Sequence, residues 1–348
     1  MRNLLDLDFS EIEKLVEDLG EKKFRAKQLF LAMNSYKNAN EITNLSKSFL
    51  AKLESEFVFC PLEIYKKYES KDGTIKFLYK LSDNNIIEGV LMSYKYGNTL
   101  CVSTQVGCRM GCKFCASSLG GLVRNLTAGE ILAQVLCVNR YLLGGLGDKR
   151  KITNVVLMGS GEPLDNYSNV VKFLRLVSCG DGINISLRNI SLSTCGLVDK
   201  IRQLTDENLP ITLTISLHAP NDELRQKTMP IASRYSISEI MDACKYYFER
   251  TKRRIVFEYA LIDGVNDTFE CADELAKLVR GLSCHVNLIP LNEVKERGLL
   301  GTKKKRAYAF MDRLTKNGVS STVRRTMGED IEGACGQLRA KVIREENE

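Results

Sequence analysis

Hydrophobic residues recur at helical spacing in the first part of the chain. In the segments 21–33 and 41–57 they return every three or four positions beside lysine and arginine, which predicts amphipathic helices. The apolar positions of these two segments are Phe24, Leu29, Phe30, Met33, Ile42, Leu45, Phe49 and Leu53. We therefore expect a mostly helical domain over residues 1–57.

Hydrophobic and polar residues alternate in the next segment. The alternation covers 74–81, after the turn signal Asp72-Gly73, and returns in 86–94 after a pair of asparagines. This pattern predicts two strands joined as a hairpin. Residues 58–98 are thus expected to form a short β extension.

From about residue 99, strand-like and helix-like segments alternate. The six apolar runs that predict strands are Leu100–Ser103, Thr153–Met158, Ser186–Ser193, Thr212–Leu217, Ile255–Leu261 and Val286–Pro290. Thr127 and Ser236 each precede a glutamate by three residues, as in the capping box that opens a helix. Repeated strand–helix units predict a parallel sheet with functional loops at the C-terminal strand ends.

Six such units are fewer than the eight that close a barrel. We therefore expect an α/β fold with a partial (β/α)6 barrel over residues 99–327. A further strand, Ser320–Arg324, is expected to lead into a C-terminal segment over residues 328–348.

The composition is that of an ordinary globular protein, with 44% hydrophobic and 27% charged residues. No apolar run has the length of a membrane span, and the N-terminus has no secretion-signal pattern, so we expect a cytoplasmic protein without a membrane partner. The net charge is +7, and the basic residues cluster. The clusters are Lys22–Lys27, Lys252–Arg254, Lys303–Arg306 and Arg324–Arg325. Each alone suits a solvated surface, but together they favour a nucleic acid as partner.

Three of the twelve cysteines lie in one short motif, Cys108-Arg-Met-Gly-Cys112-Lys-Phe-Cys115. In a reducing compartment, clustered cysteines indicate metal binding or catalysis rather than disulfides. Three thiolates can each hold one iron of a four-iron cluster and leave the fourth iron open to a ligand's nitrogen and oxygen. A zinc site would need a fourth ligand nearby, whereas His218 and His285 are distant in sequence. Most other cysteines, including Cys195, are interpreted as buried structural side chains.

The cysteine motif follows the first predicted barrel strand, with Phe114 before its last cysteine, and Gly159-Ser-Gly-Glu162-Pro follows the second strand. This combination resembles the radical S-adenosylmethionine superfamily. The resemblance implies that the cysteines hold one [4Fe-4S] cluster that cleaves S-adenosylmethionine, and that Glu162 helps to hold this ligand. The candidate S-adenosylmethionine-binding residues are Gly161, Glu162, Ser193, Ser216, Leu217, His218 and Asn292. The polar residues among them also suit a strand end, where they cap backbone groups.

Further motifs resemble the RlmN/Cfr family of RNA methyltransferases over nearly the whole chain. The segments that carry this resemblance are Leu100–Cys108, Met158–Leu164, Ser216–Ala219, His285–Pro290 and Gly328–Leu338. The last segment is the most discriminating, because most radical S-adenosylmethionine enzymes have no equivalent of it.

The resemblance implies methylation of C2 of an adenosine in 23S rRNA, and of the adenosine 3′ of some tRNA anticodons. C2 of adenine is not nucleophilic, so the family uses two molecules of S-adenosylmethionine per turnover. The first methylates Cys335, and the second gives a 5′-deoxyadenosyl radical that activates the S-methyl group for addition to adenine. Glu88 matches the family's proton acceptor. Cys101 then releases the product by forming a transient disulfide with Cys335, which a cellular reductant reopens.

Two other functions remain open from the sequence. A Cfr-like enzyme would methylate C8 of the same adenosine, although Gly-Glu-Pro-Leu164 and the residues before Cys335 favour the C2 form. A non-catalytic RNA-binding module with a structural cluster is the alternative from a different class, whereas a radical enzyme acting on a small molecule fits poorly with the basic runs. We also expect a flavodoxin-like electron donor, a monomer, and an N-terminal domain that docks RNA through Lys22–Lys27.

Overall fold

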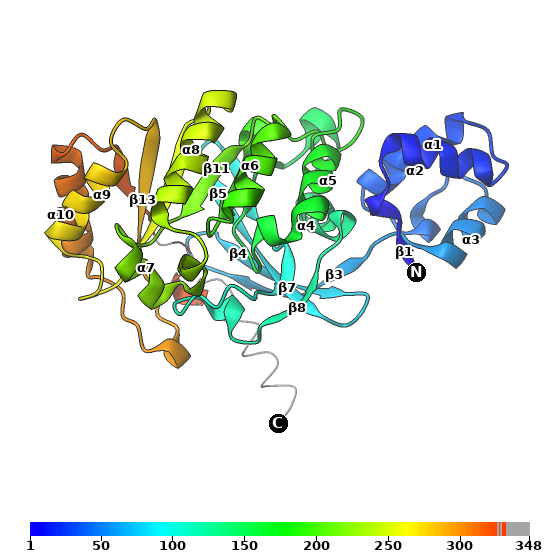
Figure 1. The fold of residues 1–348 in the computed structure, drawn as a ribbon. Helices are drawn as coiled ribbons and strands as arrows, with labels where there is room; N and C mark the ends of the chain where they lie inside the picture. Colours follow the sequence, from blue (N-terminus) through cyan, green and yellow to red (C-terminus); the bar gives the residue numbers. More distant parts are fainter. Residues whose placement is uncertain (326, 328, 332–348) are drawn as a thin grey trace.

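The computed structural model describes residues 1–325, 327 and 329–331; residues 326, 328 and 332–348 lie outside that description (Figure 1). The predicted methyl-accepting cysteine, Cys335, is among the residues that are not described. Within the described residues, no helix combines the length and apolarity that crossing a membrane requires.

Short helices form the N-terminal region. Its elements are β1 (Arg2–Asn3), η1 (Leu4–Asp6), α1 (Phe9–Asp18), α2 (Phe24–Asn34), η2 (Ala39–Glu41), α3 (Lys47–Glu56) and β2 (Phe57–Val58). Helix α3 begins later than the periodicity predicts, because the Ser46 hydroxyl accepts the amide of Phe49 and caps the helix there. The predicted apolar positions of these helices are buried except Phe24, which is 59% exposed. As the first residue of α2, Phe24 lies outside the packed core and places its ring beside the guanidinium of Arg25.

One sheet of ten strands forms the centre of the molecule. In spatial order its strands are β14 (Ser321–Val323), β13 (Cys284–Pro290), β12 (Ile255–Leu261), β11 (Thr212–Ser216), β10 (Ile190–Thr194), β9 (Ile152–Leu157), β6 (Gly97–Cys101), β5 (Ile86–Tyr94), β4 (Ile75–Leu81) and β3 (Leu62–Glu69). Strands β6 and β9 to β14 are parallel to one another, whereas β3, β4 and β5 are antiparallel. Because β14 and β3 are the two edges, the sheet is open, which confirms the predicted partial barrel.

Two details of the sheet differ from the sequence prediction. The strand expected over 320–324 pairs in parallel with β13 and so adds a seventh parallel strand to the predicted six. Strand β3 was not predicted at all, because most of its side chains are charged or exposed and only Leu62 is buried. The antiparallel strands continue the barrel sheet directly, through the pairing of β5 with β6.

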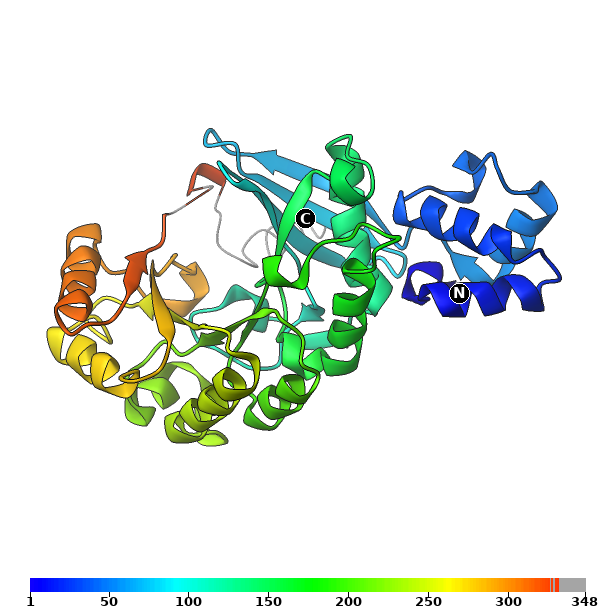
Figure 2. The same cartoon turned by 90° about the horizontal axis from the view of Figure 1, so that it is seen from above.

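Helices cover the outer face of the curved sheet, as Figures 1 and 2 show. They are α4 (Ala128–Tyr141), α5 (Tyr167–Val177), α6 (Val198–Asp206), α7 (Asp222–Thr228), α8 (Ile237–Thr251), α9 (Phe269–Leu278) and α10 (Lys304–Lys316). Both predicted capping boxes are present, at Thr127 before α4 and at Ser236 before α8. The short 3-10 turns between these elements are η3 (Ala116–Ser118), η4 (Gly147–Lys149), η5 (Pro163–Asn166), η6 (Leu187–Asn189), η7 (Pro230–Ser233), η8 (Lys295–Arg297) and η9 (Glu329–Ile331).

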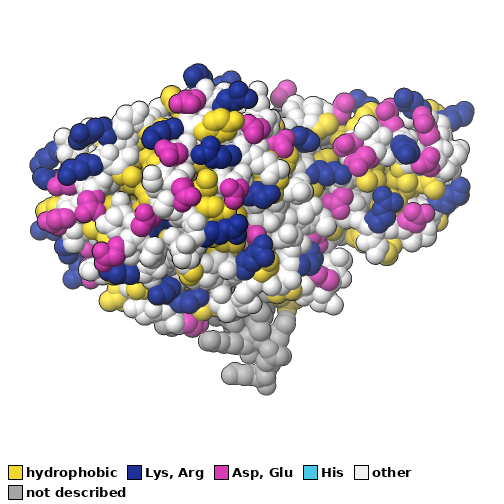
Figure 3. Space-filling view, viewed as in Figure 1, with side chains coloured by type: hydrophobic (Ala, Val, Ile, Leu, Met, Phe, Trp, Pro, Cys, Tyr) yellow, Lys and Arg dark blue, Asp and Glu magenta, His cyan; other side chains and the backbone are white. Residues whose placement is uncertain are grey.

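The N-terminal helices lie at one end of the barrel, against helix α4 (Figure 2). The carboxylate of Asp6 accepts the amide of Gly129 at 2.6 Å, so the first turn of α4 is bonded to the N-terminal region. At the other end of α4, Arg140 forms an ion pair with Glu41. On the face of the molecule in Figure 3, basic and acidic side chains are interspersed over both regions.

Candidate active site

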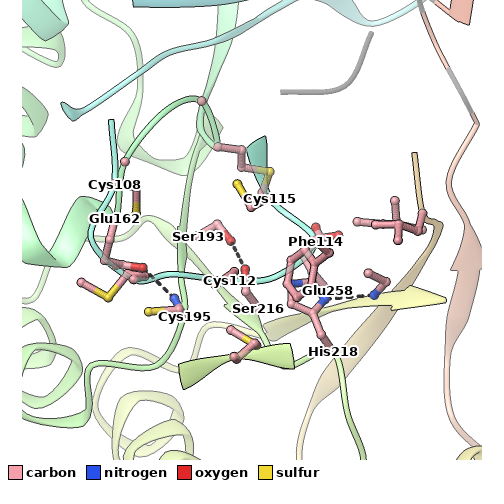
Figure 4. A pocket seen from close by; sticks show the side chains of 18 of the residues that line it. Cys108, Cys112, Phe114, Cys115, Glu162, Ser193, Cys195, Ser216, His218 and Glu258 are labelled. Carbon is pink, nitrogen blue, oxygen red and sulfur yellow. Dashed lines mark hydrogen bonds between the residues drawn. The ribbon is translucent and has the colours of Figure 1, made fainter. Parts of the chain in front are cut away.

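A cavity of about 280 Å³ opens at the C-terminal ends of the parallel strands. This is the edge of an α/β sheet where ligands bind, because the loops that follow the strands converge there. The residues that line it and matter for the chemistry are Cys108, Cys112, Phe114, Cys115, Gly161, Glu162, Ser193, Cys195, Ser216, His218, Glu258, Asn292 and Arg324 (Figure 4).

The three cysteines lie in one loop between two short strands, β7 (Gln105–Gly107) and β8 (Leu122–Asn125). Gly107 starts the loop with a positive φ of 78°, and a Cβ there would lie 2.0 Å from the carbonyl oxygen of Gly121. The loop is closed by a bond from the amide of Cys108 to the same carbonyl, at 2.9 Å. The hydroxyl of Ser118 donates to the carbonyls of Cys112 and Cys115, which fixes the second half of the loop.

The chemistry of these thiols fits a cationic cluster. Burial raises the pKa of the Cys108 thiol to about 12, and it raises that of Cys112 as well. The charges of the neighbouring cysteines act in the same direction, so three thiolates can coexist here only beside positive charge. Among the described residues no three His, Cys, Asp or Glu side chains are already gathered as metal ligands. Iron would therefore have to draw the three sulfurs together.

A tight turn after β9 carries Glu162. Gly161 adopts a positive φ of 108°, and a Cβ there would lie 2.6 Å from the Cβ of Gln105. The side-chain oxygen of Gln105 accepts the amide of Glu162 at 2.8 Å. The two carboxylate oxygens of Glu162 accept the amides of Leu164 at 3.0 Å and of Cys195 at 2.7 Å. Burial raises the pKa of Glu162, and these amide donors oppose that rise, so the turn presents a fixed carboxylate to the cavity.

The ends of β10 and β11 bring two serines together. The hydroxyl oxygens of Ser193 and Ser216 are 3.1 Å apart (Figure 4). Leu217 follows them, but its side chain is fully buried in the core and does not line the cavity. Asn292, beyond β13, lies on the cavity wall.

His218 has a single defined tautomer. Its Nδ1 accepts the amide of Ala260 at 2.9 Å, which leaves the proton on Nε2 as the available donor. Burial, with a smaller effect from the charge of Arg225, lowers the pKa of His218 to about 3. The ring of Phe114 meets the imidazole edge-on, with centroids 4.9 Å apart. His218 therefore stays neutral and links the cysteine loop to the strand ends.

A second cavity, of about 110 Å³, adjoins the first and contains Cys101. The two cavities share Ile289, Asn292 and Arg324 in their walls. Cys101 is the last residue of β6 and is buried. Glu88 lies on β5 on the same face as Val90 and Met92, which line this second cavity. Glu88 itself is buried and does not line either of these two cavities.

The sequence reasoning missed two buried charged residues near the site. Glu258, on β12, is 5% exposed and accepts the side-chain amide of Asn287 at 3.2 Å through Oε1, while its Oε2 has no hydrogen-bond partner among the described residues. Burial raises the pKa of Glu258, and the charge of Arg324 opposes the rise. The second is Arg225, on α7. An acid inside the otherwise apolar strand 255–261 was the only sequence signal for Glu258; Arg225 had none, because α7 is short and rich in charges.

Two family profiles match the chain. Residues 102–279 match the Radical SAM superfamily, and residues 2–59 match the ribosomal RNA large subunit methyltransferase N-terminal domain. The first match spans the cysteine loop and most of the parallel sheet, and the second spans the N-terminal helices.

Full-length relatives extend both matches. A probable dual-specificity RNA methyltransferase RlmN of Clostridium novyi (strain NT) is 52% identical over 347 residues, covering 99% of each chain. The corresponding protein of Clostridium perfringens (strain 13 / Type A) is 54% identical, covering 99% of this chain and 98% of its own. Among solved structures, a radical SAM methyltransferase from Sphaerobacter thermophilus is 42% identical with a TM-score of 0.92, over 97% of this chain and 99% of that one.

These matches span the sheet, the cysteine loop and the N-terminal helices without a gap in coverage, and superfamily membership implies S-adenosylmethionine and a four-iron cluster as cofactors. The chain belongs to the radical SAM superfamily and, within it, to the RlmN family of RNA methyltransferases.

Proposed function

We propose that this protein methylates C2 of an adenosine in 23S rRNA and in some tRNAs, by a ping-pong mechanism through S-methylated Cys335. One observation carries the proposal: the cysteine loop, the Glu162 turn and the polar strand ends line one cavity, and Cys101 lies in an adjoining cavity that shares part of its wall. This arrangement supports the proposal, because it needs the residues for radical generation to lie near the thiol that resolves a protein–RNA adduct.

The geometry supports the following binding roles. Cys108, Cys112 and Cys115 hold the cluster, which supplies the electron for reductive cleavage of the sulfonium. Glu162 receives the ammonium of the methionyl group, since its carboxylate is fixed by two backbone amides. Ser193, Ser216, the Nε2–H of His218 and Asn292 offer hydrogen bonds to the rest of the ligand. For Leu217 only the backbone remains a candidate, because its side chain faces the core; its amide already donates to the carbonyl of Glu258 and its carbonyl accepts Arg225.

The transfer itself uses three residues of the chain. The Cys335 thiolate takes a methyl group from one S-adenosylmethionine, releasing the thioether product, and a second molecule is consumed per turnover as the radical source. Glu88 accepts the C2 proton of the adduct, whose unpaired electron would return to the oxidised cluster. The Cys101 thiolate then attacks the sulfur of Cys335, and the bond from that sulfur to the product carbon breaks. The carbon keeps the bonding electron pair and takes up a proton to become the methyl group, and the disulfide is reduced by two electrons from a cellular dithiol.

The test is anaerobic reconstitution of the full chain with iron and sulfide, followed by nucleoside mass analysis of treated rRNA and tRNA. We expect 2-methyladenosine; 8-methyladenosine would favour the Cfr-like alternative. Cys335→Ala should abolish methylation while the cluster absorbance stays intact, and Cys101→Ala should trap covalent protein–RNA adduct. The binding-module alternative would be supported if the native chain did not methylate RNA and Cys335→Ala lowered only the affinity for RNA.

We also propose a cytoplasmic monomer that takes electrons from a flavodoxin-like donor. Light scattering on the reconstituted protein would test the oligomeric state. Replacing a chemical reductant with reduced flavodoxin would test the donor, since only a competent donor sustains more than one turnover.

A further inference from the structure

Arg225 is a fully buried arginine, and within the described residues its hydrogen bonds go to backbone carbonyls and not to a carboxylate. It projects from α7 with 0% exposure, and its Nε and Nη2 donate to the carbonyl oxygens of Leu217, at 3.2 Å, and Cys195, at 2.5 Å. Its Nη1 has no hydrogen-bond partner within the described part of the chain. The charge of Asp222 acts on Arg225, and the Asp222 carboxylate accepts the amide of Ile237 at 2.8 Å.

Such a charge is expensive to bury. An arginine stays protonated in proteins, and a buried ion without a counterion costs several kcal/mol even after relaxation. A native protein keeps one only where an anion compensates for it or where the field of the cation is used. The carbonyls of Leu217 and Cys195 supply partial charges, but they do not neutralise a full positive charge.

The residues around Arg225 indicate which anion could compensate its charge. Its Nη2 donates to the carbonyl of Cys195, which lines the same cavity as Cys112, and negative charge on Cys195 or Cys112 would act on the guanidinium. Helix α7 and the turn after it also support the cysteine loop: the amide of Lys113 donates to the carbonyl of Thr228 at 2.9 Å, and a Cβ at Gly111 would touch Pro230. The guanidinium is thus held behind the loop that carries the three cysteine ligands.

We propose that Arg225 is a positioning and charge-tuning residue, whose buried positive charge stabilises the reduced iron–sulfur cluster and raises its reduction potential. The inference rests on the proposed function in one respect only, that the cysteine loop holds a four-iron cluster. In the same position Arg225 ties together the Glu162–Cys195 contact and the Ser216–His218 turn through the two carbonyls that it binds.

The charge balance explains the direction of the effect. One electron passes from a low-potential donor to the cluster, and the cluster with its three thiolates gains one negative charge. A fixed cation nearby attracts the reduced form more strongly than the oxidised form, so it shifts the equilibrium towards reduction. Because Arg225 is buried, salt screens this attraction much less than it screens an attraction at the surface.

The experiment is a redox titration of the reconstituted full chain without S-adenosylmethionine or RNA, followed by the electron paramagnetic resonance signal of the reduced cluster. Arg225→Met and Arg225→Gln remove the charge, and the glutamine keeps a donor for the two carbonyls. Arg225→Lys keeps the charge. We expect both neutral variants to shift the equilibrium towards the oxidised form by about tenfold or more, which is about 59 mV for one electron, and the lysine variant to stay near the native potential.

The matched control is Arg234→Met, which removes an exposed arginine from the turn after α7 and should leave the potential unchanged. The proposal would be overturned if both neutral variants kept the native reduction potential while all three Arg225 variants had a lower free energy of unfolding. Arg225 would then have only a structural role. A native reduction potential in Arg225→Gln together with a shifted potential in Arg225→Met would also overturn the proposal. It would show that the hydrogen-bond donor matters and the charge does not. If one neutral variant fails to assemble the cluster, the reduction potential of the other neutral variant still tests the proposal. Failure of the native chain to assemble any cluster would instead reject the proposed function.

Discussion

A methyl group added at Gly161 would meet Gln105, whose side chain positions Glu162. We expect Gly161→Ala to lower the affinity for S-adenosylmethionine by about tenfold or more and the free energy of unfolding by about 1–3 kcal/mol. Both effects have the same cause, because the positive φ of 108° and a 2.6 Å contact cannot both be kept with a side chain present. Equilibrium dialysis with the cluster-loaded protein and urea unfolding would measure them.

Gly120→Ala is the control for that variant. Gly120 also lies near the cysteine loop, but no atom is within 4 Å of a Cβ built there and its φ is not in the left-handed region. Its affinity and stability should match the native values. Equal affinities for all three proteins would mean that the Glu162 turn does not hold the ligand.

His218 should make the folded protein sensitive to acid. Its pKa falls from 6.5 in the unfolded chain to about 3 in the folded protein, so between these values the unfolded chain binds one more proton. The stability contributed by the neutral ring is complete above pH 6.5 and is lost as the pH falls towards 3, by up to about 1.4 kcal/mol per pH unit.

His218→Asn would isolate this contribution. Asparagine tolerates the left-handed φ of 58° and offers an oxygen to the amide of Ala260 in place of Nδ1. Urea unfolding at several pH values should show a slope smaller by one proton in the variant. His285→Asn should reduce the slope less, since that ring is only partly buried. Identical pH profiles for the native and His218→Asn proteins would contradict the neutral buried state of His218.

At the scale of elements, the sequence pattern predicted those strands whose side chains are buried by packing. The six strands of the barrel are apolar because both of their faces are covered, and all six were found within a few residues of their predicted bounds. Strand β3 was not predictable in this way, because an edge strand with Lys66, Lys67 and Glu69 looks like any solvated segment. The cysteine motif was visible from spacing, whereas the position of Glu258 beside it depends on the register between β11, β12 and β13, which no local pattern encodes.

Helix α4 and the N-terminal region meet at Gly129. A Cβ there would lie 2.5 to 2.7 Å from atoms of Asn3, Leu5 and Asp6. We expect Gly129→Ala to lower the free energy of unfolding by about 1–2 kcal/mol, since the gain in helix propensity offsets only part of the clash. In limited proteolysis, the protease should also cleave faster between residues 57 and 62, because the N-terminal helices lose their contact with α4.

Gly180→Ala is the matched control, as nothing lies within 4 Å of a Cβ at that position. It should unfold and be cleaved like the native protein. If Gly129→Ala behaved like this control, the contact of Asp6 with the first turn of α4 would not hold the two regions together.

At the scale of the whole molecule, the structure changes the expectation for the basic run Lys22–Lys27. Three of its basic side chains are paired with carboxylates: Lys23 with Glu13, Arg25 with Glu21, and Lys27 with Asp181. The pairs of Lys23 and Lys27 are the more exposed ones, and surface pairs of this kind are weak and break readily when a phosphate competes. We still predict that this run contributes to RNA docking, but with less net charge than the sequence alone suggests.

Charge reversal would measure that contribution. Lys22→Glu with Lys27→Glu should weaken RNA binding and reduce the slope of log affinity against log salt by about 0.7–0.9 for each phosphate that the protein no longer neutralises. Lys245→Glu with Lys277→Glu, on the outer faces of α8 and α9, makes the same change in net charge at exposed positions away from the N-terminal helices. Equal affinities and slopes for the two double variants would place the RNA elsewhere on the molecule.

The position of Cys101 on a strand paired on both sides has a practical use. Because β6 is hydrogen-bonded to β5 and β9, the backbone of Cys101 is held in the sheet, and the residue lines the second cavity. We expect its alkylation rate to depend on how much of that cavity is occupied. The chain has twelve cysteines, so small and bulky maleimides, applied with and without RNA, would be followed at Cys101 itself by peptide mass analysis.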